Sequence, residues 1–336
     1  MRPIEISLLF GLLAFLFEIS NALSKPSAAQ RLQNLYSDNR QSLVDASAPA
    51  IIMPGVHDAL SAKIYANAGA KVLFLSGFGV SAARLGQPDV GILTLTEMES
   101  ALRSVVQVVG DTPVIVDGDT GYGGANNVRR TVRAFARAGA AAVTIEDQAF
   151  PKKCTYAAGE GVKVVSMQEC ISRVKAALVA RDEARDIDGN DILIVARTDC
   201  RAALGVEEAI ARCKVFEALG ADICYAENLQ SRQEYEYVKS QLMLSTATIL
   251  AQVETGNPNQ LLYSAQDVGV MQYDFALLGV TALQAYVRSL EASASLLMAP
   301  EASGLVNHDM DIASFEDLKA SIGFEDSESF EKRHQC

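Results

Sequence analysis

The chain has 336 residues, of which 49% are hydrophobic and 21% charged, enough apolar material for one large globular core or two modest ones. Its 41 acidic residues outnumber the 29 basic ones and give a formal charge of −12, which argues against a nucleic-acid or anionic-membrane binder. With three histidines and no tryptophan, a metal site built from histidine is not expected.

The first 22 residues have the pattern of a secretory signal peptide. Arg2 precedes an uncharged run at 8–17, and small residues at 20–22 form a cleavage pattern. The run is shorter than the roughly 20 apolar residues of a membrane span. Glu5 and Glu18 argue against an arginine-rich transit peptide. We expect entry into the secretory route, with a plastid as one onward destination and no stable membrane span after processing. An uncleaved anchor and a mitochondrial location are the alternatives.

A linker at 23–47 contains one expected helix at 28–36, and short apolar strands then alternate with helices. Strands are predicted at 50–53, 71–75, 113–116, 141–145, 192–196, 222–226, 248–253 and 273–278. Helices are predicted at 58–68, 95–109, 125–138, 167–186, 206–219, 233–241, 261–268 and 282–297. This pattern assigns 48–300 to one barrel domain and 301–336 to a C-terminal tail.

Glycines follow several of the predicted helices, just before the next strand. Gly69, Gly139 and Gly220 fit the left-handed cap that ends a helix in a repeated helix-to-strand unit. Apolar strands alternating with helices indicate a parallel sheet covered on its outer face. Eight such units in about 250 residues predict an α/β fold, a closed (β/α)8 TIM-type barrel. No glycine-rich dinucleotide motif follows the first strand, which argues against a Rossmann fold.

The six cysteines do not form an evident disulfide framework. Cys170 and Cys213 fall in helical patterns, Cys224 falls in a strand, and Cys336 is the last residue. A chain of this size needs no covalent cross-links to be stable. We therefore expect free thiols, most of them packed in the core.

In a barrel of this kind, reactive residues lie at the carboxyl ends of the strands. Any single polar residue there could be a helix cap or a solvated loop residue, but their joint placement at one rim indicates an active site. They are Ser76, Asp117, Asp119, Glu146, Arg197, Asp199, Glu227, Asn228, Gln252 and Glu254.

The carboxylates after the third and fourth strands indicate a metal site. Side chains alternate along a strand, so Asp117 and Asp119 are expected on the same side. Together with Glu146 they would repel one another unless a cation or a buried partner offset their charge. Oxygen ligands without histidine suit Mg2+ better than zinc. Cys154, on the lysine-flanked loop that follows, supplies a proton donor or acceptor, and the neighbouring lysines favour its thiolate.

Six motifs, in their order and spacing, resemble the isocitrate lyase and phosphoenolpyruvate mutase superfamily. They are LSG (75–77), LGQPD (85–89), VDGDTGYG (116–123), IEDQ (145–148), KKC (152–154) and ARTD (196–199). The resemblance covers roughly residues 48–298 and is greatest to the methylisocitrate-lyase-like branch, which includes carboxyvinyl-carboxyphosphonate phosphorylmutase-like proteins. It implies a barrel that forms dimers or tetramers by exchanging its last helix, with magnesium at the rim.

Residue by residue, the resemblance implies a division of roles at the metal. Asp117 is similar to the direct metal ligand. Asp119 and Glu146 are similar to residues that bind the metal through water or surround its ligands, and Asp89 supports the same network.

The resemblance also implies the residues that meet the substrate. Ser76 and Gly77 resemble the segment that binds an α-oxo-carboxylate. Arg197 resembles the arginine that clamps a carboxylate, a role that suits its planar fork. Glu227 resembles a carboxylate near the substrate hydroxyl or its proton path. Cys154 resembles the cysteine that exchanges a proton with the departing carbanion.

The chain departs from the lyase pattern on the side of the site that sets specificity. Thr155 and Tyr156 stand where the lyases have glycine and histidine, a pair that contacts the distal carboxylate of the substrate. Gln252, assigned here to substrate binding, replaces an asparagine. Phe78 replaces a glycine and is expected to narrow the pocket. Poor turnover of isocitrate and methylisocitrate follows from these changes.

The leading hypothesis is a magnesium-dependent lyase that cleaves a carbon–carbon bond in a 2-hydroxy di- or tricarboxylate and releases an α-keto acid or glyoxylate. One alternative on the same fold is a hydrolase of oxaloacetate or another α-keto acid. Another is a phosphonopyruvate-type phosphonomutase or hydrolase, and a non-enzymatic barrel is the last. The expected partners are a small carboxylate substrate and further copies of the chain in a homodimer or homotetramer, with no nucleic acid.

Overall fold

The structure is a computed structural model that describes residues 25–43, 48–156, 161–256, 260, 262–299 and 311–334. The signal peptide predicted at 1–22 lies outside the described residues. In the described part of the chain, no helix is long and apolar enough to cross a membrane.

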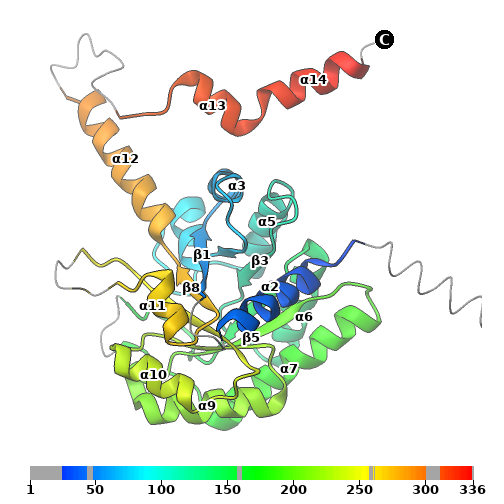
Figure 1. Cartoon of the computed structure of the whole chain (residues 1–336), viewed down its shortest axis with the longest axis vertical. Helices are drawn as coiled ribbons and strands as arrows, with labels where there is room; N and C mark the ends of the chain where they lie inside the picture. The colour runs from blue at the N-terminus through cyan, green and yellow to red at the C-terminus, as the bar shows by residue number, and fades with distance from the viewer. Residues whose placement is uncertain are drawn as a thin grey trace, which may run out of the picture.

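Eight parallel strands close into a barrel in which each strand pairs with the next and β8 pairs with β1 (Figure 1). The strands are β1 (Ile51–Val56), β2 (Leu73–Leu75), β3 (Val114–Asp117), β4 (Ala142–Glu146), β5 (Leu193–Thr198), β6 (Ile223–Ala226), β7 (Ala247–Gln252) and β8 (Phe275–Leu278). The predicted (β/α)8 fold is confirmed, and every predicted strand overlaps an observed one.

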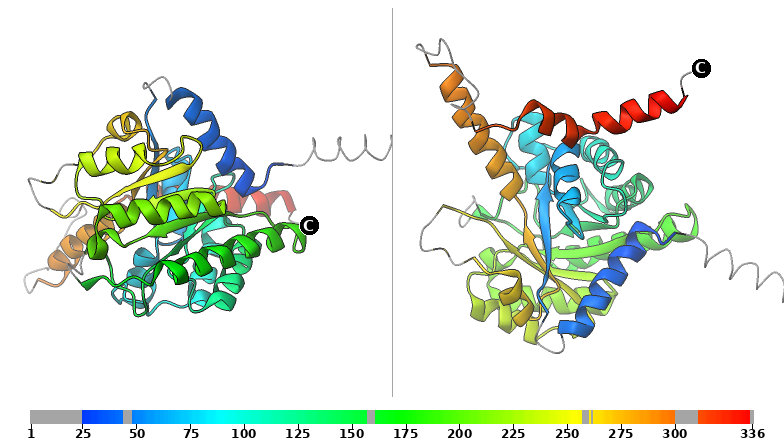
Figure 2. Two further views of the ribbon diagram at one scale, coloured as in Figure 1. Left: turned by 90° about the horizontal axis from the view of Figure 1, so that it is seen from below. Right: turned by 45° about the horizontal axis from the view of Figure 1, so that its top comes forward.

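Helices connect the strands and cover the barrel, with α2 before the first strand and α12 to α14 after the last (Figures 1 and 2). They are α2 (Ala28–Leu43), α3 (Ala59–Asn67), α4 (Gly77–Val80), the π-helix η1 (Ser81–Leu85), α5 (Leu95–Val106), α6 (Ala125–Ala138), α7 (Met167–Asp186), α8 (Arg201–Leu204), α9 (Val206–Leu219), α10 (Arg232–Ser240), α11 (Ala265–Val270), α12 (Thr281–Leu297), α13 (Phe315–Ile322) and α14 (Phe324–His334). The predicted glycine caps are present, because Gly139 and Gly220 end α6 and α9 with φ of 92° and 90°.

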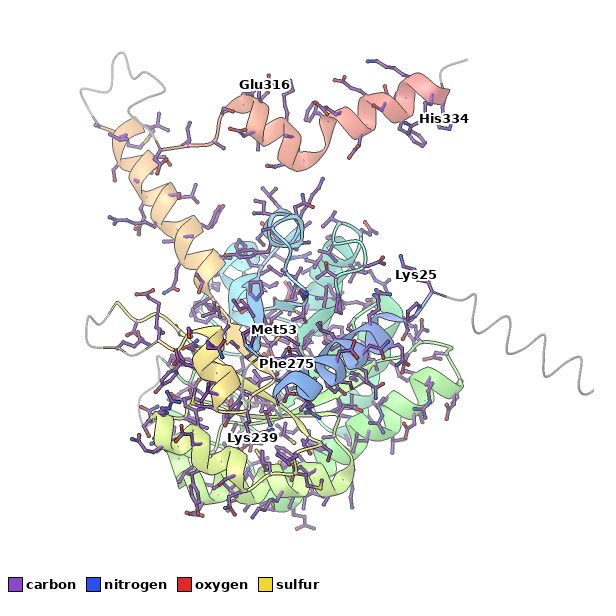
Figure 3. The ribbon with its side chains drawn as sticks, viewed as in Figure 1. Lys25, Met53, Lys239, Phe275, Glu316 and His334 are labelled. Atoms are coloured by element: carbon purple, nitrogen blue, oxygen red, sulfur yellow. The ribbon has the colours of Figure 1, made fainter. Side chains whose placement is uncertain are left out.

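The strands are apolar on both faces, as expected for a parallel sheet covered by helices. Met53 and Phe275, labelled near the middle of the barrel in Figure 3, belong to the cluster that fills its interior. Val116 and Val143 belong to the larger cluster between the strands and the surrounding helices. Since apolar residues occupy both faces, polar groups concentrate where the strands end.

The helix after β8 contacts β1 and then projects away from the barrel. Figure 1 shows α12 projecting away from the strands, and Leu283 is its buried residue. Tyr286 and Leu290 on α12 are 49% and 48% exposed, and Ile52 on β1 and Ile64 on α3 are 51% and 49% exposed. The chain therefore leaves an apolar face of α12 and an apolar strip of the barrel wall uncovered. Within the segment expected to be a tail, α13 packs against α3.

Candidate active site

A cavity of about 610 Å³ opens at the carboxyl-terminal rim of the barrel. Ten residues are assigned to the metal, the substrate or the chemistry from the sequence, and seven of them line the cavity: Ser76, Asp89, Asp117, Cys154, Arg197, Glu227 and Gln252. The other three, Gly77, Asp119 and Glu146, are buried next to these residues. The cavity thus lies at the rim where the strand-end pattern gathers polar residues.

Asp117, the last residue of β3, is held in place by backbone amides. Its Oδ2 accepts a hydrogen bond from the Gly77 amide at 3.2 Å, and its Oδ1 accepts one from the Asp119 amide at 3.2 Å. A Cβ atom on Gly77 would lie 3.0 Å from Asp117 Oδ2, so glycine permits this close approach. Ser76 caps α4 by accepting from the Gly79 amide at 3.1 Å, and its hydroxyl proton stays available to a ligand.

Asp119 lies beyond the end of β3, so strand alternation does not place it, yet its carboxylate lies on the same side as that of Asp117, because a Cβ atom on Gly77 would lie 3.0 Å from Asp117 Oδ2 and 3.4 Å from Asp119 Oδ1. Its φ is 48°, in the left-handed region, and its carboxylate pairs with Lys152. The same ammonium group lies 2.9 Å from Asp89 Oδ1. Burial raises the pKa of Asp119 to about 6, and the charges of Asp117 and Asp89 act in the same direction while Lys152 opposes them.

Lys152 is a site residue to which the sequence pattern assigns a different role. A lysine beside Cys154 is expected to favour the thiolate, whereas the structure buries the Lys152 ammonium group among the carboxylates. Burial alone would lower the pKa of Lys152, but Asp119, Glu146 and Asp89 outweigh it and raise that pKa well above its usual value. The KKC motif gives no signal of this, because the direction of a loop side chain depends on tertiary packing.

Glu146, at the end of β4, is buried with one oxygen left unpaired. Its Oε1 has no hydrogen-bond partner among the described residues, and its Oε2 lies 3.5 Å from Arg197 Nε. Burial, reinforced by Asp199, raises the pKa of Glu146 well above its usual value. A buried carboxylate oxygen without a partner is costly, and it indicates that a ligand completes the site.

Arg197 and Glu227 form the polar wall opposite the loop that carries Cys154. Arg197 Nε donates to Asp199 Oδ1 at 2.7 Å, and its Nη2 lies 3.1 Å from Glu227 Oε2. Glu227 also accepts hydrogen bonds from the hydroxyls of Tyr225 and Tyr156. Burial raises the pKa of Glu227, while Arg197 and the two tyrosine hydroxyls lower it. Burial, reinforced by Asp199, outweighs them, so the pKa of this buried carboxylate is raised above its usual value.

The loop after β4 is fastened on both sides of Cys154. The Gln148 side chain donates to the carbonyl of Lys153 at 3.0 Å and accepts from its amide at 2.9 Å. Asn228 Nδ2 donates to the carbonyl of Thr155 at 3.3 Å. Cys154 itself is partly exposed and lines the cavity.

Four other cysteines lie in the core as free thiols, as predicted. They are Cys170, Cys200, Cys213 and Cys224. Burial raises the pKa of Cys170 and of Cys200 to about 12. It raises the pKa of Cys213 and of Cys224 as well. A neutral buried thiol is inert, so Cys154 is the accessible cysteine of this group of five.

Phe78 and Gln252, two of the residues that depart from the lyase pattern, both lie in the cavity wall, but only Gln252 is hydrogen-bonded to the backbone there. Phe78 lines the cavity, as expected. Gln252 also lines it, but its amide is bonded to the backbone of Tyr263, donating to the carbonyl and accepting from the amide, each at 2.8 Å. The Gln252 side chain is therefore fixed in the wall, and it keeps one N–H donor and one oxygen lone pair for a ligand.

The oxygens around Asp117 fit a hard divalent cation. Within the described ranges, no three His, Cys, Asp or Glu side chains converge into a ready-made metal cage. Mg2+ needs no such cage, because it keeps several waters and commonly takes only one or two carboxylates from the protein. Asp117 provides one fixed carboxylate, and the unpaired Oε1 of Glu146 provides an acceptor for a metal-bound water.

This architecture defines the class of protein: a TIM-type barrel with carboxylates, an arginine and a loop cysteine around one rim cavity. The chain belongs to the phosphoenolpyruvate phosphomutase family, whose model matches residues 41–294. The resemblance to the isocitrate lyase and phosphoenolpyruvate mutase superfamily is thereby confirmed.

Individual relatives point to chemistry on carboxylates. The chain is 38% identical to the 2,3-dimethylmalate lyase of Eubacterium barkeri over 216 residues, which are 64% of this chain and 71% of that protein. An oxaloacetate acetylhydrolase in complex with 3,3-difluorooxalacetate superposes with a TM-score of 0.80 at 28% identity, covering 91% of this chain and 96% of that one. A phosphonopyruvate hydrolase complex with oxalate and Mg2+ has a TM-score of 0.72 at 25% identity, covering 93% and 100%. The family thus includes lyases, hydrolases and mutases that act on carboxylates.

Proposed function

We propose that this chain is a magnesium-dependent lyase that cleaves a carbon–carbon bond in a 2-hydroxy di- or tricarboxylate and releases an α-keto acid or glyoxylate. The observation that carries the proposal is the placement of Asp117, Arg197, Glu227 and Cys154 around one cavity. These side chains supply a metal ligand, an anion clamp, a proton acceptor and a proton donor.

Asp117 would hold Mg2+ directly, with Glu146, Asp119 and Asp89 around it through water. When bound, the ion would act as a Lewis acid on the charge that develops at the new carbonyl oxygen. The unpaired oxygen of Glu146 and the Mg2+ in the related phosphonopyruvate hydrolase complex support this assignment.

Side chains of the protein can bind the substrate carboxylate, remove the hydroxyl proton and protonate the leaving carbon. Arg197 uses Nε and Nη2 on Asp199 and Glu227, which leaves its other amino group for a substrate carboxylate. Glu227 takes the hydroxyl proton as the carbon–oxygen double bond forms. The electron pair of the broken carbon–carbon bond stays on the leaving carbon, and the thiol of Cys154 protonates it.

Tyr156 bears on which substrates the site accepts. Its hydroxyl is bonded to Glu227, so the phenol that replaces a histidine is not available to a distal carboxylate. The same cavity is lined by apolar residues, among them Phe78, Leu283 and Val287, and by the charged residues Lys153 and Arg288. The engaged phenol of Tyr156 and the bulk of Phe78 favour a substrate whose distal group is smaller than that of isocitrate.

A hydrolase of oxaloacetate is the second candidate, supported by the similarity to oxaloacetate acetylhydrolase. Both activities are tested by incubating purified protein and Mg2+ with a panel of 2-hydroxy acids, oxaloacetate and phosphonopyruvate, and identifying the products directly. Release of an α-keto acid or glyoxylate from a 2-hydroxy acid supports the lyase. Oxalate and acetate formed from oxaloacetate, with no product from the 2-hydroxy acids, would support the hydrolase, and no product from any compound would refute both.

We further propose that the active protein is a homodimer or homotetramer that exchanges α12. The support is the pair of uncovered apolar surfaces, one on α12 and one on the barrel wall beside β1 and α3. Among the described residues neither surface is covered, and contiguous apolar surface of this kind commonly marks a protein–protein contact.

A further inference from the structure

We propose that Arg212, on the outer helix α9, is a positioning residue that orients the Arg197 clamp through Asp147 and Asp199. Arg212 does not line the cavity, and none of the motifs in the sequence includes it. The inference rests on the proposed function only in that Arg197 is taken to bind a substrate carboxylate.

Arg212 is 2% exposed although its helix lies on the outside of the barrel. Its guanidinium group uses each of its nitrogens on a different partner. Nη1 donates to Asp147 Oδ2 at 2.8 Å, Nη2 donates to the carbonyl of Val165 at 3.0 Å, and Nε donates to Glu208 Oε1 at 3.0 Å. A buried arginine with three directed bonds fixes geometry in a way that a lysine, with one point of charge, cannot reproduce.

Asp147 passes this constraint from α9 to the end of β5. It follows Glu146, and its side chain is buried away from the cavity. Its Oδ2 also accepts from the Thr198 hydroxyl at 2.5 Å, and its Oδ1 accepts from the Asp199 amide at 2.9 Å. One carboxylate therefore ties Arg212 to the two residues that follow Arg197.

Asp199 is the last link before the cavity. Its Oδ1 accepts from Arg197 Nε at 2.7 Å, and its Oδ2 accepts from Arg197 Nη2 at 3.2 Å and from Gln148 Nε2 at 2.5 Å. This two-point contact sets the plane of the Arg197 guanidinium. The Gln148 bond adds the loop of Cys154 to the same network, because Gln148 also holds the backbone of Lys153.

The contact with Val165 gives Arg212 a second route to the site. The Val165 amide donates to the carbonyl of Asp147 at 2.9 Å, at the point where the chain returns from the Cys154 loop toward α7. Arg212 thus bonds both Asp147, at the end of β4, and Val165, where the Cys154 loop ends. Residues behind a functional group that fix its orientation typically change activity about 10- to 100-fold when they are removed.

A half-buried arginine–aspartate pair at the other end of β5 provides a control. Arg181 on α7 donates to Asp222 Oδ2 at 2.9 Å, and that oxygen also accepts from the Ile194 amide at 2.8 Å. Asp222 precedes β6, at the rim opposite the cavity. Arg181→Met removes an arginine–aspartate ion pair that is less buried than that of Arg212, and it lowers stability without a path to Arg197.

The test compares the wild type with Arg212→Met, Arg212→Lys and Arg181→Met. Thermal unfolding is recorded, and oxalate binding in the presence of Mg2+ is measured by calorimetry well below all midpoints. We chose oxalate because it is a small dicarboxylate that can bind at Arg197 and has no distal group to contact the rest of the cavity. The kcat and KM are measured on the substrate identified from the panel.

We expect Arg212→Met to weaken oxalate binding and to lower kcat/KM by about tenfold or more, with Arg212→Lys between it and the wild type. Arg181→Met should lower the unfolding midpoint and leave oxalate affinity and kcat within about twofold, the scatter expected of a distant site. If Arg212→Met does not fold, the same comparison is made with Arg212→Lys. An Arg212 variant that loses stability but keeps wild-type oxalate affinity and kcat would overturn the positioning role and leave the proposed function standing. Wild-type protein that binds no oxalate would overturn both.

Discussion

Replacing Thr155 by glycine and Tyr156 by histidine should convert the site toward cleavage of isocitrate. In the structure the Tyr156 hydroxyl is bonded to Glu227, and the Thr155 carbonyl accepts from Asn228. The double substitution removes the phenol, returns flexibility to the backbone and offers an imidazole that is half protonated at about pH 6.5.

The expected change in kcat/KM follows from one hydrogen bond gained, between the imidazolium and the distal carboxylate, and one lost, between Tyr156 and Glu227. A contact between imidazolium and a distal carboxylate contributes about 1.5–3 kcal/mol, which is roughly ten- to a hundredfold in kcat/KM for the tricarboxylate. Loss of the Tyr156 bond removes one partner from Glu227, which keeps Tyr225, Arg197 and the Asn228 amide. Because the carboxylate remains bonded, we expect activity on a smaller substrate to fall by about tenfold at most.

The assay is steady-state kinetics at about pH 6.5 on isocitrate, methylisocitrate and a matched acid that lacks the distal carboxylate. Tyr156→Phe is the control, since it removes the hydroxyl and keeps the ring. We expect Tyr156→Phe to reduce activity on the smaller acid without improving isocitrate, and the double variant to improve isocitrate. For each variant we compare kcat/KM on isocitrate with kcat/KM on the smaller acid. If this ratio is the same in Tyr156→Phe and in the double variant, the argument that Thr155 and Tyr156 set specificity is refuted.

Further predictions concern the metal, the thiol and the assembly. Asp117→Ala should abolish the Mg2+ binding that calorimetry measures. The free energy of unfolding should change by only about 1 kcal/mol, because relief of carboxylate repulsion offsets two lost backbone hydrogen bonds. Unchanged Mg2+ affinity would exclude Asp117 as the ligand. Alkylation with peptide mapping should label Cys154 well before the buried Cys170 and Cys213, and equal rates would remove the support for its proton transfer. Leu290→Glu, on the exposed face of α12, should shift the protein toward monomer in light-scattering measurements, and an unchanged mass would count against exchange of this helix.

Sequence periodicity is sufficient to predict the barrel and the rim. Strand ends carry the polar residues in a parallel barrel for a topological reason, so the periodicity alone predicts that Ser76, Asp117, Arg197 and Glu227 lie together. The neighbours Glu146 and Asp147 at the end of β4 face opposite sides: Glu146 lies beside the cavity residues, and Asp147 bonds Arg212 on the outer helix.

Other features depend on tertiary packing that the sequence does not reveal. Asp119 lies on the predicted side, but a left-handed turn after the end of β3 places it there, and strand alternation does not. The burial of Lys152 and the backbone bonds of Gln252 are set by loops, where side-chain direction has no period. Arg212 lies 65 residues from Asp147, and nothing in a helical pattern distinguishes a buried arginine from an exposed one.

The central claim is that the cavity breaks a carbon–carbon bond and that a protein thiol protonates the leaving carbon. The most direct measurement is NMR analysis of the products formed in D2O by the Mg2+-loaded enzyme and by Cys154→Ser, using the best 2-hydroxy acid of the panel. We predict that the wild type yields equimolar α-keto acid or glyoxylate and a carboxylate carrying one solvent-derived deuterium, and that the Cys154→Ser rate falls by about 100-fold or more. An unlabelled carboxylate product, or a Cys154→Ser variant that works at the wild-type rate, would contradict the account.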